Sequence, residues 1–269
     1  MRVIQIFLVI HLLVLASVAK ADFPQRQKDT ILLDFGLSAG AMTAWGISRW
    51  GWFQHSPKVQ REGWFAKDTH AGGADKTGHF FMSYVLADVL NWDFNRNGVK
   101  NPERTAALTA MAAMTLLEVG DATSSKYGFS MEDLVADAGG VLASWFLATH
   151  PQWDDLIDIR MEYWPSAGFD LGKDASSDYS GMRHLLAFKS SGIPALSTTP
   201  LRWFELQTGY YTRGFRSYDD AALRDNPERH LYVGVGLSIP ELFGKRPAAR
   251  TVFSYIQPPN FNLSTSYRF

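Results

Sequence analysis

The chain has 269 residues, with 26 basic and 27 acidic side chains and no cysteine. This near balance of charge provides no basic surface for nucleic acid, so we expect no nucleic-acid partner. The absence of cysteine excludes disulfides, thiolate metal ligands and a lipid-modified cysteine, so any bound metal must be held by His, Asp or Glu. Aromatic residues make up 14% of the chain, and such residues are favoured where a protein meets a membrane interface.

The first 21 residues have the features of a secretory signal peptide. Arg2 supplies a positive charge, residues 4–15 form a short apolar run, and Ala19-Lys20-Ala21 forms a small-x-small cleavage site. A permanent membrane anchor needs about 18 to 20 apolar residues, which is longer than this run. We therefore expect residues 1–21 to be removed on export and the mature chain, beginning near Asp22, to lie in the periplasm or at the outer membrane.

The next part of the chain, residues 22–150, has a helical pattern of apolar residues. The pattern predicts four helices, at residues 30–52, 75–92, 102–118 and 131–148. Pro102 at a helix start, and Ser130 with Asp133 three residues later, are typical helix start signals. The helices are only marginally long enough to cross a bilayer, which takes about 20 residues. We therefore expect a four-helix bundle in the periplasm, resting on a membrane, and not four membrane spans.

The last part, residues 151–269, changes to short alternating runs separated by turn residues. The clearest strands are residues 202–213 and 229–238, and about six strands are expected. In the second of these, Leu231, Val233, Val235 and Leu237 face one way and small or polar residues the other, as in a strand that faces lipid or in a soluble sandwich. The run that ends at Phe269 resembles the terminal strand of bacterial outer-membrane barrel proteins.

These patterns predict an α+β fold, in which an N-terminal four-helix bundle is followed by an antiparallel β-sheet or small barrel-like β region. Because the terminal strand is of the outer-membrane type and the chain lacks a lipid-modified cysteine, we expect the β region to attach the protein to the outer membrane.

Polar side chains interrupt three of the apolar helices. Asp75 and His79 open one helix, Glu118 ends the next, and Asp133 and Asp137 lie in the first turns of the last. The spacing i, i+4 places Asp75 and His79 on one helix face, and likewise Asp133 and Asp137. Because buried carboxylates and imidazoles are costly without partners, we expect these groups to converge on one site.

Three roles fit this candidate site. His79, oriented by Asp75, can act as a general base, with Glu118 or Asp133 as a second acid or base. Alternatively His79, Glu118, Asp133 and Asp137 can supply the nitrogen and oxygen ligands of a divalent metal. The third role is structural, in which the carboxylates complement helix dipoles and His79 and Glu118 tie helices together.

The polar residues also form an ordered motif. The order is D-K-T-G-H-F, then an acidic residue that ends the next apolar helix, then S-x-E-D-x-x-x-D-x-G-G. This order resembles the VanZ-like pattern and, more closely, the YfiM-like family of predicted periplasmic proteins of unknown function. The positions that match the family are Asp75, Lys76, His79, Glu118, Ser130, Asp133, Asp137 and Gly140.

The chain departs from the pattern in two ways. Asp137 stands where VanZ-like chains usually have Asn, which changes the charge of the site, and the lipoprotein cysteine is absent. The resemblance implies an envelope role and no established reaction. We therefore expect an outer-membrane-associated protein that binds an envelope ligand. The alternatives are a metal-dependent hydrolase of an envelope lipid or glycan, and a structural module.

Two other features carry weaker predictions. Residues 93–98 have the D-x-N-x-N-G spacing that opens a calcium loop, but Arg104 stands where a bidentate Glu is needed, and a turn between helices explains the same residues. His184 and His230, near predicted strand starts, are expected at the surface.

Overall fold

The computed structural model describes residues 23–243, 247–259 and 261–269, so the predicted signal peptide lies outside the described residues. The chain forms two compact units. Unit 1 comprises the chain up to Glu62 together with Met82–Thr149, and unit 2 comprises Gly63–Phe81 and His150–Phe269. The predicted α+β class, with helices followed by a sheet, is confirmed.

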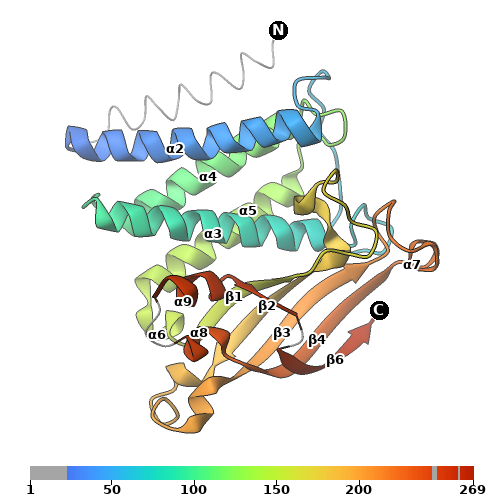
Figure 1. Ribbon diagram of the computed structural model, residues 1–269. Helices are drawn as coiled ribbons and strands as arrows, with labels where there is room; N and C mark the ends of the chain where they lie inside the picture. Colours follow the sequence, from blue (N-terminus) through green and yellow to red (C-terminus); the bar gives the residue numbers. More distant parts are fainter. Residues whose placement is uncertain (1–22, 244–246, 260) are drawn as a thin grey trace. The chain divides into compact units, whose positions relative to one another are not determined.

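The long helices lie where the sequence predicts them (Figure 1). They are α2 (Gln25–Trp45), continued by one π-helical turn, η1 (Gly46–Trp50), then α3 (Ala74–Arg96), α4 (Pro102–Asp121) and α5 (Met131–Thr149). Pro102 begins α4 as expected, because proline lacks the N–H that a first helical residue would leave unpaired. Helix α3 runs without a break through residues 81 and 82, so it belongs to both units.

The core of unit 1 is built around α4, which packs against both α2 and α5. Trp52 is buried in this core, and its indole Nε1 donates a hydrogen bond to Asp121 Oδ1 at 2.7 Å. Glycines at positions 46 and 120 make room for the indole, because a Cβ at either would lie within 2.5 Å of the ring. The short alanines of α4 allow the neighbouring helices to approach in the same way.

The outer surfaces of the unit 1 helices are apolar. Exposed large apolar side chains include Leu33, Leu37, Val89, Trp92, Leu108 and Leu142. Within the described residues one helical segment, Gln25–Trp50, is long and apolar enough to cross a membrane, with 26 residues, a mean hydropathy of 1.3 and 22% of its most apolar window buried. Core helices and signal sequences satisfy the same criterion, so the segment is a candidate span by length and composition alone.

Two carboxyl groups inside unit 1, those of Asp34 on α2 and Asp93 on α3, interact electrostatically. Their like charges are close enough to interact, and such an interaction favours a proton on one of the two carboxyl groups. Burial, followed by the interaction with Asp93, raises the pKa of Asp34 from 3.8 to about 6. The raised pKa means that the folded state favours protonated Asp34. The contribution of this proton to the stability of the folded protein is therefore fully present below about pH 4 and is lost as the pH rises through 6.

We expect Asp34→Asn to raise the melting temperature of the protein at pH 7.5 and to leave it nearly unchanged at pH 4. The amide mimics the protonated acid and removes the repulsion between the two carboxylates. Thermal unfolding at the two pH values, followed by circular dichroism, measures this difference, and Asp29→Asn, on the same helix, is the matched control. An equal effect of Asp34→Asn at both pH values would contradict the raised pKa of Asp34.

The calcium-like segment is a helix end. Residues Asp93 to Arg96 are the last residues of α3, and Asn97 Nδ2 donates to Asp93 Oδ2 at 2.8 Å. Gly98 has a φ of 69°, in the left-handed region where helices commonly end. The side-chain oxygen of Asp93 therefore caps this turn, as in the turn interpretation of the sequence.

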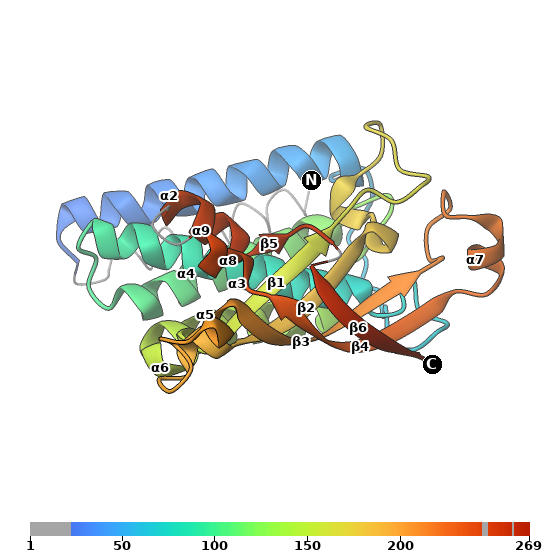
Figure 2. The same cartoon turned by 60° about the horizontal axis from the view of Figure 1, so that its bottom comes forward.

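Unit 2 contains one open six-stranded sheet in the order β5-β1-β2-β3-β4-β6, and of the two predicted alternatives the sheet is therefore the one observed (Figure 2). All neighbours pair antiparallel except β5 and β1. The strands are β1 (Ile157–Tyr163), β2 (Met182–Lys189), β3 (Phe204–Arg213), β4 (Glu228–Leu237), β5 (Ile256–Gln257) and β6 (Asn262–Arg268). Short helices connect them: α6 (Pro151–Asp154), α7 (Ala221–Asp225), α8 (Ile239–Leu242) and α9 (Pro247–Phe253).

One face of this sheet buries a polar network. Arg160 on β1 is fully buried, and its Nη1 donates to Glu205 Oε1 on β3 at 2.7 Å and to Gln257 Oε1 on β5 at 3.1 Å. Asn262 on β6 donates to Glu162 on β1 at 3.1 Å. Because three strands separate β1 from β6 in the sheet, this contact requires the sheet to curl around the network.

The opposite face of the sheet is apolar and exposed along β3, β4 and β6. Leu206, Leu231, Val233, Val235, Leu237 and Leu263 are 37–88% exposed. The pairing register places Leu206 opposite Val235, and Val235 opposite Leu263, in one row across the three strands. The polarity of the sheet is therefore the reverse of that in a soluble sandwich, where the apolar face is buried.

Candidate functional site

The loop before α3 fixes the start of the helix that carries the first two candidate residues. Gly72 and Gly73 have φ values of 60° and 90°, in the left-handed region that favours glycine. The hydroxyl of Tyr210 donates a hydrogen bond to the carbonyl oxygen of Gly72. This loop sets the first turns of α3, on which Asp75 and His79 are separated by one turn.

Asp75 pairs with its neighbour Lys76. The Lys76 Nζ donates to Asp75 Oδ2 at 2.8 Å, and both side chains are buried. An ion pair that is desolvated in this way keeps both members charged only if their geometry is close. The positive charge of Lys76 therefore balances the negative charge of Asp75 at the start of α3.

Glu118 and Asp133 are joined through the cap of α5. Glu118 lies near the end of α4, and its Oε2 accepts a hydrogen bond from the backbone N–H of Ser130 at 2.9 Å. The hydroxyl of Ser130 in turn accepts from the backbone N–H of Asp133 at 3.2 Å, as the sequence predicts for a helix cap. One carboxylate oxygen of Glu118 thus holds the segment between α4 and α5.

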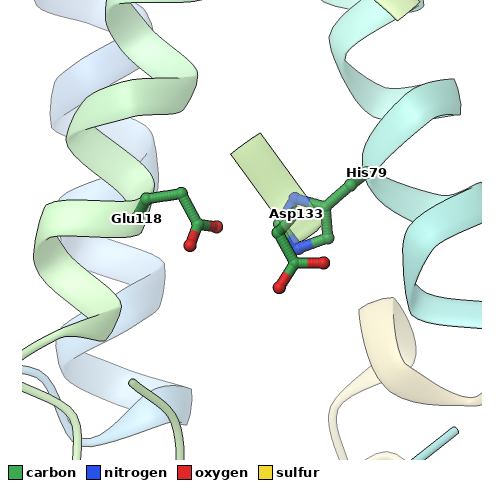
Figure 3. Close-up of side chains that lie close together, drawn as sticks. All are labelled: His79, Glu118 and Asp133. Atoms are coloured by element: carbon green, nitrogen blue, oxygen red, sulfur yellow. The ribbon is translucent and has the colours of Figure 1, made fainter. Parts of the chain in front are cut away.

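The side chains of His79, Glu118 and Asp133 lie close together (Figure 3). One ligand atom from each, an imidazole nitrogen and two carboxylate oxygens, lies within 4.8 Å of the other two. A second group, formed by Glu62, Asp75 and Asp133, meets the same criterion. Asp133 is common to both groups, which together comprise the four candidate residues Asp75, His79, Glu118 and Asp133 and also Glu62, which the sequence did not single out.

Asp137, the fourth predicted metal ligand, is in neither group within the described part of the chain. It lies one turn after Asp133 on α5 and is fully buried. A set of three ligands, one nitrogen and two oxygens, is therefore the arrangement that this geometry offers to a metal.

Two histidines that were expected at the surface are partly buried in unit 2, so that prediction is wrong. His184 on β2 accepts or donates a 2.9 Å hydrogen bond with the hydroxyl of Thr77, and burial lowers the pKa of His184 to about 4. His230 on β4 stacks on Tyr211 with ring centroids 4.5 Å apart. The strand alternation of Met182, His184 and Leu186 on one face was the available sequence signal for the first of these.

The chemistry of His79, Glu118 and Asp133 follows from their charges. Two buried carboxylates near one imidazole can bind a divalent cation, because the cation supplies the opposite charge that close carboxylates need. Nitrogen and oxygen ligands suit manganese, iron or zinc. The same groups also meet the needs of general acid–base chemistry, in which an imidazole exchanges a proton beside a carboxylate.

Comparison with known proteins gives one match. Residues 61–149, about a third of the chain, match the profile of a family described as predicted periplasmic lipoprotein (DUF2279). The matched segment contains all the candidate site residues, and the description agrees with the predicted export to the periplasm. The chain itself has no cysteine to accept a lipid. No significant match to a curated protein or to a solved structure was found.

Proposed function

We propose that the protein is an exported envelope protein at the outer membrane, and that His79, Glu118 and Asp133 hold a divalent metal ion to which a polar envelope ligand binds. The observation that carries this proposal is the convergence of one imidazole and two buried carboxylates on one place. Glu118 and Asp133 bring two carboxylates into a buried setting beside the imidazole of His79, and groups of this kind are ligands for divalent metals.

The metal interpretation accounts for this charge better than a purely structural cluster does. A protonated His79 would offset one of the two carboxylates, whereas a divalent ion offsets both. Three protein ligands also leave coordination positions open, as in metal sites that bind a ligand or activate water.

The membrane part of the proposal rests on the surfaces of the two units. In unit 1, polar groups such as Glu118 and Asp137 are buried while apolar side chains such as Leu33 and Leu108 are exposed. In unit 2, the sheet buries its charged network and exposes an apolar face. Exposed apolar surface of this extent marks a site of contact with membrane or protein.

A second candidate function is the hydrolysis of an envelope lipid or glycan, in which a metal held by His79, Glu118 and Asp133 would activate water and Asp75 would act as a second acid or base. This second candidate is favoured by the open coordination positions. The finer resemblance to YfiM-like chains with a VanZ-like motif, through Asp75 to Gly140, is part of the same proposal and adds no reaction to it.

Addition of Mn²⁺ or Zn²⁺ to metal-free protein should raise its melting temperature, and His79→Ala should abolish this rise. An ion at about a hundred times its dissociation constant stabilises a folded protein by about 2.7 kcal/mol. Thermal unfolding with and without each ion measures the effect. Asp133→Asn is expected to behave like His79→Ala, because it removes a charged ligand and keeps the side chain's shape.

The matched control is His55→Ala, which removes an exposed imidazole and should keep the full metal response. A structural cluster predicts a different pattern, in which His79→Ala lowers the melting temperature of metal-free protein and no ion stabilises the wild type. That pattern would contradict the proposed site.

A further inference from the structure

A cavity of about 230 Å³ lies entirely within unit 2, at the end of the polar face of the sheet. Its charged lining residues are Glu162 on β1, Arg183 on β2 and Arg213 on β3. The other lining residues are Trp164, Pro165, Ser166, Ser180, Gly181 and Pro259. None of these residues belongs to the candidate metal site.

Both guanidinium groups are held in fixed positions. The Cζ atoms of Arg183 and Arg213 lie 4.6 Å and 4.5 Å from the centre of the Tyr211 ring. Arg213 Nη1 also donates to the carbonyl oxygens of Thr212 at 2.7 Å and Met182 at 3.3 Å. Stacking on an aromatic ring orients a planar guanidinium and leaves its edge available to an anion.

Arg183 forms one long ion pair, with Glu162. The nearest acidic atom is Glu162 Oε2, 3.6 Å from Arg183 Nη1, which exceeds an ordinary hydrogen-bond distance. The other oxygen, Glu162 Oε1, already accepts from Gln257 at 2.8 Å and from Asn262 at 3.1 Å. Within the described ranges Arg183 forms no hydrogen bond, so its fork of donors is free to bind a ligand.

A buried hydroxyl also lacks a partner. The Oγ of Ser166 is buried and, among the described residues, has no hydrogen-bond partner, although its backbone N–H donates to Asp178 Oδ2 at 2.9 Å. The second hydroxyl, that of Ser180, donates to Asp219 at 2.7 Å. Buried polar groups are rarely left unpaired, so the hydroxyl of Ser166 indicates that a ligand atom binds in the cavity.

We propose that this cavity binds the phosphate group of an anionic ligand through Arg183, Arg213 and the hydroxyl of Ser166. A guanidinium fork matches two phosphate oxygens, and the combination of two guanidiniums with a hydroxyl supplies donors on several sides of a tetrahedral anion. The cavity is larger than a phosphate, so it also holds a small substituent such as glycerol. The phosphate can come from free phosphate or from the headgroup of a phospholipid.

The electrostatics of Arg183 and Arg213 agree with an anionic ligand. Burial, followed by the like charge of Arg183, lowers the pKa of Arg213 to about 10. Burial also raises the pKa of Glu162, which makes it a weaker counterion. An anion between the two guanidiniums would relieve this repulsion.

Titration calorimetry of the purified full chain with inorganic phosphate tests the proposal, and a second titration uses dihexanoylphosphatidylglycerol below its micelle concentration. Arg183→Gln should weaken binding about tenfold or more, because a charge-assisted hydrogen bond is lost. Ser166→Ala should weaken binding without lowering the melting temperature, because its hydroxyl has no protein partner to lose. Arg250→Gln, which removes an exposed guanidinium, is the control and should bind as the wild type does.

If the protein binds phosphate and not the lipid, the ligand of the cavity is free phosphate. If it binds the lipid and not phosphate, the ligand is the headgroup of a phospholipid. If the wild type binds neither, or if Arg183→Gln and Ser166→Ala bind as tightly as the wild type, the proposal is overturned. Because Ser166→Ala leaves all charges in place, it keeps the test valid even if an arginine variant fails to fold.

Discussion

Replacement of Arg160 with methionine is expected to destabilise unit 2 by about 3–5 kcal/mol, which is the usual cost of removing one partner from a buried ion pair. Arg160 is fully buried between the carboxylates of Asp158 and Glu205. Burial alone would lower the pKa of Arg160, but the two carboxylates more than offset it and raise the pKa above its ordinary value. Without the guanidinium, Glu205 would remain buried without this ion pair, whereas Asp158 would keep its 2.6 Å ion pair with Lys189.

Urea unfolding followed by circular dichroism measures this loss. Arg268→Met is the matched control, because Arg268 forms an ion pair with Glu228 while 59% of its own side chain is exposed, and such pairs contribute at most about 1 kcal/mol. The double variant Arg160→Met with Glu205→Gln should recover part of the lost stability, since it removes the stranded charge of Glu205. Equal effects of Arg160→Met and Arg268→Met would show that the network is solvated.

Val235→Arg is expected to impair membrane association strongly while leaving the fold intact in water. Val235 lies in the middle of the exposed face of β4 and is 54% exposed. A charged residue that faces lipid at mid-membrane costs about 2–4 kcal/mol, whereas an exposed site in water tolerates it within about 0.5 kcal/mol. From the sequence alone this variant could not separate a lipid-facing strand from a sandwich core, but the exposure of Val235 removes the second interpretation.

Carbonate extraction of membranes from cells that express each variant measures the association. Wild-type protein should stay in the membrane pellet and Val235→Arg should shift to the supernatant. Ala221→Arg, at an exposed position of α7 away from the strand face, should behave as the wild type does. Release of wild-type protein by carbonate would contradict attachment through this face.

The sequence predicted the helices well because their ends carry local signals. Pro102 and Ser130 mark two starts within the chain itself, and the structure has helices beginning at Pro102 and directly after Ser130. Helix α3 extends four residues past its predicted end at Trp92, because Asn97 bonds back to Asp93 and prolongs the last turn. The π-helical turn after Trp45 has no comparable signal in a pattern of apolar residues.

The polar face of the sheet was harder to predict. The alternation of Asp158, Arg160 and Glu162 with apolar residues was a readable strand signal, yet the partners of Arg160 are 45 and 97 residues away. Spacing within a segment does not reveal such distant contacts. It also does not show that the polar face is the buried one, so the alternation alone would place these charges in water.

The candidate site could be predicted from the sequence because its residues lie near helix ends with an i, i+4 spacing. That spacing grouped Asp133 with Asp137, whereas the structure places Asp133, and not Asp137, among the grouped ligand atoms. The rotation of α5 about its axis decides which of two residues one turn apart faces a neighbour, and packing sets that rotation. A single sequence shows which residues share a helix face, but it does not show which neighbouring element packs against that face.

Metal analysis of protein purified from the bacterial envelope, by mass spectrometry of its elemental content, tests the proposed site most directly. We expect about one manganese, iron or zinc ion per chain in the wild type and in His55→Ala, and less than a tenth of that in His79→Ala and Asp133→Asn when both variants remain folded. A folded wild-type protein that contains no divalent metal, and takes up none when it is supplied, would contradict the proposed metal site and leave Asp75, His79, Glu118 and Asp133 as a structural tie between helices.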